Sequence, residues 1–393
     1  MSKVTVKDID FSGKRVIMRV DFNVPLDDQG GISDDARIAA ALPTIEHILK
    51  NNPSKLILMS HLGRPKGKVV DSLRMDPVAK RLAELLGRKV KKLDDCVGPE
   101  IAQAIESSDA KVFLLENLRF HSEEEKGDDD FAKQLAGLAD VYVNDAFGTA
   151  HRAHASTTTI AHFIKESCVG FLIEKELNYL SKVTYSPEKP FVAILGGAKV
   201  SDKITVVENL LKKVDRIIVG GAMAYTFLKS KSIDVGASLV EEDKLDLASS
   251  ILAKADQAGV EIVLPVDHLA VEDLDRPKTK KIVAIIPAGY KGVDVGPKTV
   301  ALFSEKLKDA KTVLWNGPLG IFENPAYAQG TREIAEFLTS IEATVVVGGG
   351  DSAAAAKKFK VKDRLSHIST GGGASLEFIE GKELPGIAAI PDK

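Results

Sequence analysis

Short apolar runs rich in β-branched residues recur along the chain, and amphipathic stretches of helix length separate them. The runs lie at 15–20, 55–59, 111–115 and 140–143 in the first half, and at 191–195, 216–219, 261–264, 312–315 and 344–347 in the second. Runs that are apolar throughout are typical of strands buried on both faces of a parallel sheet. The pattern therefore predicts an α/β protein with two Rossmann-like domains, each a parallel sheet with helices on both faces.

A domain boundary is predicted near 181–190, where Pro187 and Pro190 interrupt the regular patterning. An N-terminal domain would then span 1–180 and a C-terminal domain 186–368, each of ordinary domain size. We expect the connecting segment, and the residues near Ser369 and Thr370, to act as hinges.

Composition and charge narrow the classes of function. Of the 393 residues, 44% are hydrophobic and 28% are charged, and 53 basic against 56 acidic residues give a net charge of -3. This balance argues against a dedicated nucleic-acid or membrane-surface protein. Cys96 and Cys168 are the only cysteines and have no ligand-like spacing, which indicates neither a disulfide framework nor a structural zinc site. With no signal-like apolar start, a cytoplasmic protein is expected.

Glycine-rich loops follow the second-half strands. The most informative is Gly348-Gly349-Gly350-Asp351-Ser352, where glycines would admit an anion to a helix N-terminus and Asp351 and Ser352 offer oxygens to magnesium. An ordinary strand-to-helix turn with an N-cap explains this loop equally well when it is taken alone. The other loops contain Gly196, Gly197, Ala198 and Lys199; Gly220, Gly221 and Ala222; and Asn316, Gly317 and Pro318.

Two further features suit a nucleotide in this half. Lys199 and Lys203 are four residues apart where a helix should begin, so an anion could sit between them on one helix face, although two solvated surface lysines explain them as well. Glu323 could accept hydrogen bonds from ribose hydroxyls, or be one more exposed glutamate.

The loops after the first-half strands are rich in cations instead. Four arginines, Arg37, Arg64, Arg119 and Arg152, are accompanied by His61, His151 and His154. Guanidinium groups bind phosphate and carboxylate bidentately, so this set would suit a small acid bearing both groups. Surface arginines are the alternative for any single one of them.

Three sequence patterns were tested as signs of other functions, and none supports them. The segment 63–69 is not a Walker A loop, because its glycines are too close and Val69 replaces the required hydroxyl. His151 and His154 lack further metal ligands, so we predict no zinc there. The dinucleotide-binding fingerprint is missing after the first strand, which disfavours a nicotinamide-dependent dehydrogenase. A non-catalytic binding protein would usually need export, and no export signal is seen.

Eight longer blocks of the sequence can be taken together: 19–25, 60–65, 116–120, 144–154, 196–203, 315–318, 348–352 and 369–375. In content and order, these blocks resemble the phosphoglycerate kinase family over essentially the whole chain. The resemblance implies a kinase that transfers a phosphoryl group reversibly between 1,3-bisphosphoglycerate with ADP and 3-phosphoglycerate with ATP, in glycolysis and gluconeogenesis. It also implies a monomer, and a C-terminal segment 374–393 that packs back on the N-terminal domain.

The resemblance also implies roles for individual residues. The acid would be bound by Asp21, Asn23, Arg37, His61, Arg64, Arg119 and Arg152. ATP or ADP would be bound by Gly197, Ala198, Lys203, Gly221, Asn316, Glu323, Gly349, Gly350, Asp351 and Ser352, with Asp351 at Mg²⁺. Transfer would use Arg37, Lys199, Lys203, Gly371 and Gly372. A carboxylate acceptor is already ionised at neutral pH, so this chemistry needs no general base.

Overall fold

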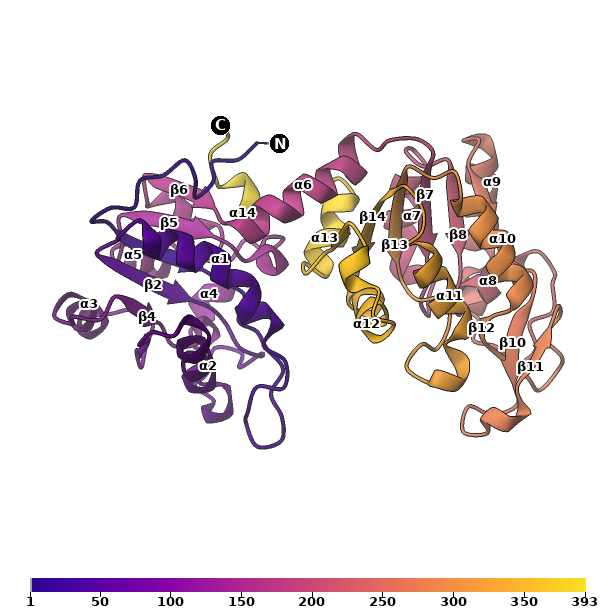
Figure 1. Cartoon of the computed structure of the whole chain (residues 1–393), viewed down its shortest axis with the longest axis horizontal. Coiled ribbons are helices and arrows are strands. Elements are labelled where there is room, and N and C mark those ends of the chain that lie inside the picture. Colours follow the sequence, from indigo (N-terminus) through magenta and orange to yellow (C-terminus); the bar gives the residue numbers. More distant parts are fainter. Residues whose placement is uncertain (1) are drawn as a thin grey trace. The chain divides into compact units, whose positions relative to one another are not determined.

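The computed structural model describes residues 2–393, and the chain separates into two compact units (Figure 1). The first unit comprises the chain up to Asn178 together with Glu383–Lys393, and the second runs from Tyr179 to Lys382. The predicted connecting segment begins inside helix α6 (Phe171–Tyr185), which continues across the division. Of the predicted returning segment 374–393, only the part from Glu383 onward belongs to the first unit.

The first unit is built around a six-stranded parallel sheet with the strand order β3-β4-β2-β1-β5-β6. Its strands are β1 (Arg15–Arg19), β2 (Lys55–Met59), β3 (Lys91–Lys92), β4 (Val112–Leu114), β5 (Val141–Asn144) and β6 (Glu166–Val169). Its helices are α1 (Ala36–Lys50), α2 (Asp76–Leu86), α3 (Pro99–Glu106), α4 (Ser122–Lys126), α5 (Asp129–Ala136), most of α6, and α14 (Pro385–Ala388). The four strands predicted here are confirmed, while β3 and β6 carried no recognised signal.

The C-terminal residues complete this unit. A bridge pairs Lys3 with Asp392, and the buried Asn144 side chain donates to the Gly386 carbonyl at 2.9 Å. The Gly386 N–H in turn donates to the Ala150 carbonyl at 2.9 Å. The end of the chain is therefore anchored beside the loop that follows β5.

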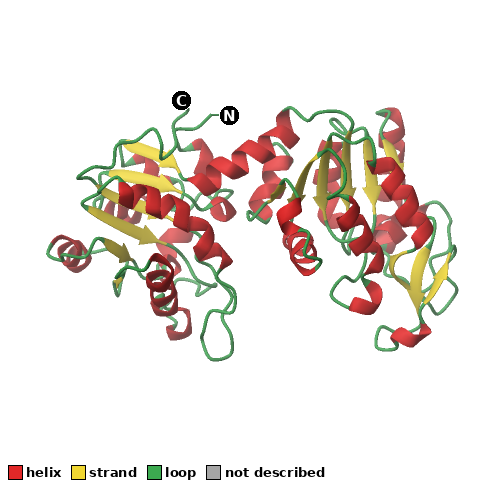
Figure 2. Ribbon diagram, viewed as in Figure 1, coloured by secondary structure: helices red, strands yellow, loops and turns green. Residues whose placement is uncertain are grey.

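The second unit contains another six-stranded parallel sheet, with the order β15-β14-β13-β7-β8-β9. Its strands are β7 (Phe191–Leu195), β8 (Arg216–Val219), β9 (Glu261–Val263), β13 (Thr312–Asn316), β14 (Thr344–Gly348) and β15 (His367–Ile368). Its helices are α7 (Ile204–Leu210), α8 (Met223–Ser230), α9 (Leu245–Gln257), α10 (Pro297–Leu307), α11 (Gln329–Phe337), α12 (Gly350–Lys358) and α13 (Gly373–Ile379). Helices flank the sheet on both sides (Figure 2), as the predicted α/β class requires.

A three-stranded antiparallel sheet, which the apolar runs did not predict, also belongs to the second unit. It consists of β10 (His268–Val271), β11 (Lys281–Val283) and β12 (Lys291–Val295), with β10 in the centre. Only β10 is buried throughout; most of β11 is exposed, and exposed strands do not produce apolar runs. This sheet supplies one wall of the site described below.

Local signals explain where individual helices begin and end. Asp128 caps α5 by accepting a hydrogen bond from the Phe131 N–H at 2.9 Å. Helix α2 has a proline in its first turn and ends at Gly87, whose φ of 60° is readily adopted by glycine. Within residues 2–393, no helix combines the length and the apolar character needed to cross a bilayer.

Candidate active site

The arginine cluster of the first unit is assembled from the loops at the carboxyl ends of its parallel strands. Asp21 and Asn23 follow β1, His61 and Arg64 follow β2, and Arg119 lies in a 3₁₀ turn, η2 (Leu118–Phe120), after β4. Arg152 comes from the loop after β5, while Arg37 lies in the first turn of α1.

Hydrogen bonds connect three of these loops. The Gly63 N–H donates to Asn23 Oδ1 at 2.9 Å, and the Gly63 carbonyl accepts from the Arg119 guanidinium at 2.9 Å. Arg119 Nε is 3.3 Å from Glu125 Oε1, an ion-pair distance at which the N–H is not aligned for a hydrogen bond. The backbone of Gly63 therefore positions both a predicted amide and a predicted guanidinium.

Arg37 forms an ion pair with Asp21. The Arg37 side chain is 43% exposed, whereas that of Asp21 is 13% exposed. Arg64 is exposed as well. These two arginines are therefore accessible to a ligand, while Arg119 is buried.

A fully buried arginine, which was not among the predicted site residues, adjoins this cluster. Arg19, the last residue of β1, donates to Ser156 Oγ at 2.8 Å and to His61 Nδ1 at 3.1 Å. Ser156 Oγ in turn donates to the buried Glu124 carboxylate at 2.6 Å. The signal available in the sequence was an arginine inside an otherwise apolar strand, because a buried arginine needs buried hydrogen-bond partners.

Arg19 determines how His61 can act. A guanidinium can only donate, so His61 Nδ1 must accept, and a neutral ring then carries its proton on Nε2. Burial of His61 lowers its pKa well below the usual value, and Arg19, Arg119 and Arg37 lower it further. His61 is therefore a neutral donor near pH 7, able to offer Nε2–H to an anion.

The same electrostatic influence extends to the other histidines and arginines of the cluster. Burial lowers the pKa of His154 to about 4, with contributions from Arg119, Arg19 and Arg152. Burial also lowers the pKa of Arg119, and Arg152 contributes to that shift. Arg152 Nε donates to His151 at 3.2 Å. Positive charge held by arginines, with neutral histidines between them, makes this a site for a small multivalent anion.

The second unit contains a pocket of about 360 Å³ between its glycine loops and the antiparallel sheet. Five of the predicted nucleotide residues line it: Gly197, Ala198, Gly221, Glu323 and Asp351. The lining also includes apolar residues that the sequence analysis did not single out: Tyr225, Leu239, Leu274, Val293, Leu319 and Ile321.

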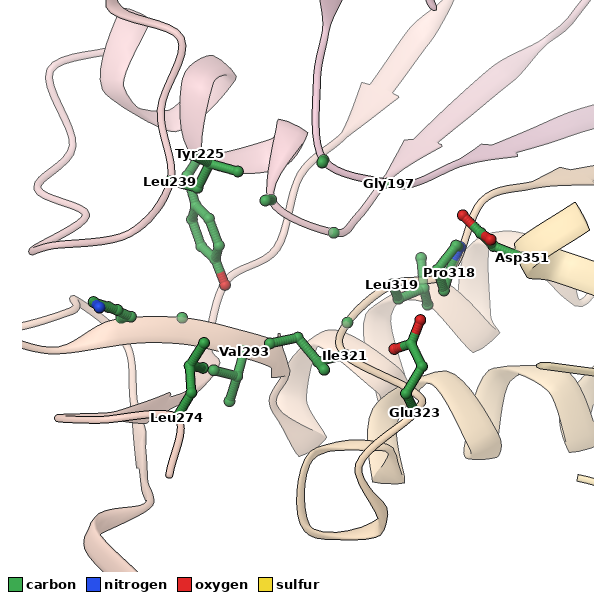
Figure 3. A pocket seen from close by; sticks show the side chains of 16 residues that line it. Gly197, Tyr225, Leu239, Leu274, Val293, Pro318, Leu319, Ile321, Glu323 and Asp351 are labelled. Carbon is green, nitrogen blue, oxygen red and sulfur yellow. The ribbon is translucent and has the colours of Figure 1, made fainter. Parts of the chain in front are cut away.

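The pocket has two chemically different ends (Figure 3). Tyr225, Leu239, Leu274 and Val293 gather at one end, and the carboxylates of Glu323 and Asp351 lie toward the other. An apolar end fits a planar base, and a polar end fits a sugar and phosphates. The apolar residues come from α8, β12 and the loops after α8, β10 and β13, and no local sequence motif connects these segments.

Several glycines of this site also have a packing role. A Cβ on Gly196 would lie 2.0 Å from the Pro318 carbonyl oxygen, and one on Gly221 would lie 2.6 Å from the Gly197 backbone. These glycines allow neighbouring loops to pack closely against each other, and Gly221 also lines the pocket. A Cβ on Gly197 or Gly350 would meet nothing within 4 Å, so the ligand-facing interpretation fits those two positions.

Lys199 and Lys203 do not share a helix face, which corrects the prediction made from their spacing. A 3₁₀ turn, η5 (Ser201–Lys203), separates Lys199 from α7, which begins only at Ile204. Lys199 is exposed, whereas Lys203 is partly buried and donates to the Asn316 carbonyl at 3.3 Å. Burial lowers the pKa of Lys203 to about 8, opposed by the charge of Asp351.

Asn316 is the last residue of β13. Its side-chain amide donates to the Gly348 carbonyl at 3.1 Å, and its Oδ1 is buried with no hydrogen-bond partner among the described residues. The Asn316 side chain therefore links the ends of β13 and β14, and its Oδ1 acceptor remains open.

The first turn of α12 tests the magnesium prediction. Gly349 precedes the helix with a φ of 89°, and the Asp351 carboxylate is exposed. Ser352 is fully buried, and its hydroxyl accepts from the Gly317 N–H at 2.6 Å. Asp351 therefore fits as a single carboxylate ligand of the kind that holds Mg²⁺ together with phosphate oxygens, whereas Ser352 serves the loop.

The predicted Gly371 and Gly372 precede the short helix α13. The Gly371 N–H donates to Ser369 Oγ at 3.2 Å, and Gly372 has a φ of 52°. A Cβ on Gly372 would meet nothing within 4 Å, so backbone conformation is what favours glycine there.

An arginine cluster for a small anion and a separate pocket with an apolar end and two carboxylates define a nucleotide-dependent phosphotransferase of the α/β class. The family model described as "Phosphoglycerate kinase" matches residues 6–382. The chain belongs to the phosphoglycerate kinase family. It is accordingly a glycolytic phosphotransferase with a carboxyl group as acceptor and a nucleotide as substrate.

Individual members of the family match this chain over its full length. The chain is 55% identical to the phosphoglycerate kinase of Gloeothece citriformis (strain PCC 7424) and 53% identical to that of Moorella thermoacetica, with 100% of each chain covered. The solved structure of phosphoglycerate kinase from Coxiella burnetii matches with a TM-score of 0.91 and 40% identity, covering 98% of both chains. The expectations of fold class, family and enzyme class are thus confirmed.

Proposed function

We propose that the arginine cluster of the first unit binds 3-phosphoglycerate or 1,3-bisphosphoglycerate, and that the pocket of the second unit binds ATP or ADP. The arginine cluster around the neutral His61 carries this assignment, because it offers several guanidinium groups and one neutral donor to a single small acid. Asp21 and Asn23 would hold Arg37 and the Gly63 backbone in place and accept from substrate hydroxyls.

In the pocket, the apolar end would receive the adenine and Glu323 the ribose hydroxyls. Gly349, Gly350 and the N-terminus of α12 would face phosphate oxygens, since their N–H groups lack partners within the helix. Mg²⁺, held by Asp351 and phosphate oxygens, would neutralise negative charge on the nucleotide.

Phosphoryl transfer would be direct and in line. A carboxylate oxygen of the acid forms a bond to the terminal phosphorus as the bond from that phosphorus to the bridging oxygen breaks, leaving ADP. The carboxylate is already ionised, so no proton has to be removed. Arg37, Lys199, Lys203 and the N–H groups near Gly371 and Gly372 would stabilise the transferring group.

Because the acid and the nucleotide would bind to different units, we propose that transfer requires hinge bending that brings them together and excludes water. The segments 181–190 and Ser369–Thr370 are the proposed hinges. A monomeric state and a cytoplasmic location remain predictions, as does the lack of a nucleic-acid or membrane partner.

The test is a coupled assay of ADP formation from Mg-ATP and 3-phosphoglycerate with Arg37→Ala, Lys199→Ala and Lys80→Ala. Lys80 is an exposed residue of α2 and serves as the matched control. We expect the first two variants to lose at least about 100-fold in kcat, since transition-state charge is worth several kcal/mol. Nucleotide binding by Lys199→Ala, and full activity of Lys80→Ala, should be retained. Unchanged kcat in Arg37→Ala and Lys199→Ala would reject their roles without rejecting the family.

A further inference from the structure

A cluster of three side chains that could bind a metal ion lies outside the sites described above. Asp95 and Cys96 lie in the loop between β3 and α3, and His121 lies between η2 and α4. One ligand atom from each of these three residues lies within 4.8 Å of the other two. His121 Nε2 is 2.6 Å from Asp95 Oδ1, and the Cys96 thiol donates to the Glu116 carbonyl at 3.1 Å.

The three side chains are arranged from the interior to the surface. Cys96 is fully buried, His121 is 28% exposed and the Asp95 side chain is 52% exposed. The His121 ring is supported by Phe131, with the ring centroids 5.0 Å apart. A cation could therefore reach the sulfur from solvent past the histidine and the carboxylate.

Hydrogen bonds already position two of the three ligands. The Cys96 N–H donates to Asp95 Oδ1 at 2.7 Å, and the Cys96 thiol is held against the Glu116 carbonyl. A metal ion would displace the thiol proton, which passes to solvent.

The spacing suits a tetrahedral ion. Metal bonds of about 2.0–2.3 Å to nitrogen, oxygen and sulfur place ligand atoms roughly 3.2–3.7 Å apart around zinc. The exposed Asp95 and the half-buried His121 can reach that spacing by small side-chain rotations, while Cys96 stays fixed. One sulfur, one imidazole and one carboxylate select a thiophilic ion over magnesium, and a fourth position is left for water.

We propose that Asp95, Cys96 and His121 form a binding site for a thiophilic divalent cation of the zinc type. The site joins the loop after β3 to the residue that follows η2, so an occupied site would hold in place the turn that contains Arg119. Sequence spacing could not reveal it, because His121 is distant from the two other ligands along the chain and the cysteine has no cysteine partner.

The test uses Cd²⁺ and Co²⁺ as probes with the reduced full-length protein, in an excess of Mg²⁺ that occupies carboxylate-only sites. We expect one equivalent of Cd²⁺ to produce thiolate-to-metal absorption in the ultraviolet, and Co²⁺ to give the intense visible bands of a tetrahedral site. Cys96→Ser should abolish both signals, and His121→Asn and Asp95→Asn should each weaken Cd²⁺ binding at least tenfold.

The matched control is Cys168→Ser, because Cys168 is the other buried free cysteine and lies in β6. Its metal signals should equal those of the wild type. Circular dichroism checks that each variant is folded, and the His121→Asn and Asp95→Asn variants keep the test informative if Cys96→Ser does not fold. The proposal is overturned if the wild type gives no thiolate absorption, if Cys168→Ser removes it, or if His121→Asn and Asp95→Asn bind Cd²⁺ as tightly as the wild type.

Discussion

Replacing the buried Arg19 with methionine should weaken both the first unit and its substrate site. Methionine has nearly the length of the arginine stem but no donors. The change removes the hydrogen bonds to Ser156 and His61, so the Ser156 hydroxyl that donates to the buried Glu124 loses its guanidinium partner. Removing one partner from a buried charged network costs about 3–5 kcal/mol. We expect the free energy of unfolding to fall by that amount, measured by urea denaturation.

The effect on substrate follows from the tautomer of His61. Without Arg19, nothing requires His61 Nδ1 to accept, so the ring can carry its proton on either nitrogen. A lost hydrogen bond to an anion costs roughly 1.5 kcal/mol or more, equivalent to at least about tenfold in affinity. KM for 3-phosphoglycerate should therefore rise about tenfold, while KM for Mg-ATP stays unchanged. Nitrogen-15 NMR of the histidine rings should show the wild-type His61 protonated on Nε2 and the variant as a mixture.

Arg15→Met is the matched control, because Arg15 lies at the other end of the same strand. Its side chain is 45% exposed and pairs with Asp140, which is 44% exposed. Exposed ion pairs contribute up to about 1 kcal/mol, so the stability loss should stay within that range and KM should not change. The reasoning is refuted if Arg19→Met is no less stable than Arg15→Met and retains both the wild-type KM and the Nε2–H tautomer.

Three further outcomes can be checked. Burial lowers the pKa of Lys203 to about 8, so its positive charge is present below that pH and lost above it. Mg-ADP affinity, measured by calorimetric titration, should therefore decline above pH 8 in the wild type but not in Lys203→Arg. Parallel pH profiles for the two proteins would contradict this. Burial raises the pKa of Asp294 to about 7, so the protonated carboxyl stabilises the fold by on the order of 4 kcal/mol below its unfolded-state pKa, and this contribution is lost as the pH rises toward 7. Asp294→Asn should lack this part of the stability decline between pH 4 and 7 in urea titrations, and a profile identical to that of the wild type would count against it. Gly221→Ala should lower the unfolding free energy by about 2 kcal/mol or more, because Gly221 has a φ of 66° and an added Cβ would meet the Gly197 backbone. Gly350→Ala is the control and should not destabilise α12, because an added Cβ there would meet nothing within 4 Å. Equal melting temperatures for the two variants would argue against the packing role of Gly221.

The predicted strands are those whose apolar runs reflect burial on both faces. The bounds of β2, β7 and β8 coincide with the predicted runs at 55–59, 191–195 and 216–219. The two-residue strands β3 and β15 and the exposed β11 were missed because they are too short or too polar to form such a run. The cationic loops of the first unit could be listed from sequence because parallel strands bring their carboxyl ends to one edge.

The position of a helix start was less predictable. Lys199 and Lys203 were placed on one helix face from their spacing, but the chain first forms the 3₁₀ turn of η5, and the regular helix begins after Lys203. Helix ends are specified weakly by local sequence, since their unsatisfied N–H groups can find partners elsewhere in the fold.

By itself, the sequence determined the α/β class, the family, most strands and the residue types that follow each of them, because burial on both faces and loop chemistry are recorded locally along the chain. Only the tertiary structure decided which ring nitrogen of His61 carries a proton, that Arg19 is buried behind it, and that Tyr225 and Val293 share a pocket wall. It also decided that Gly196 and Gly221 accommodate neighbouring backbone. These properties depend on desolvation and on contacts between segments far apart in the chain, and no local pattern of residues specifies either.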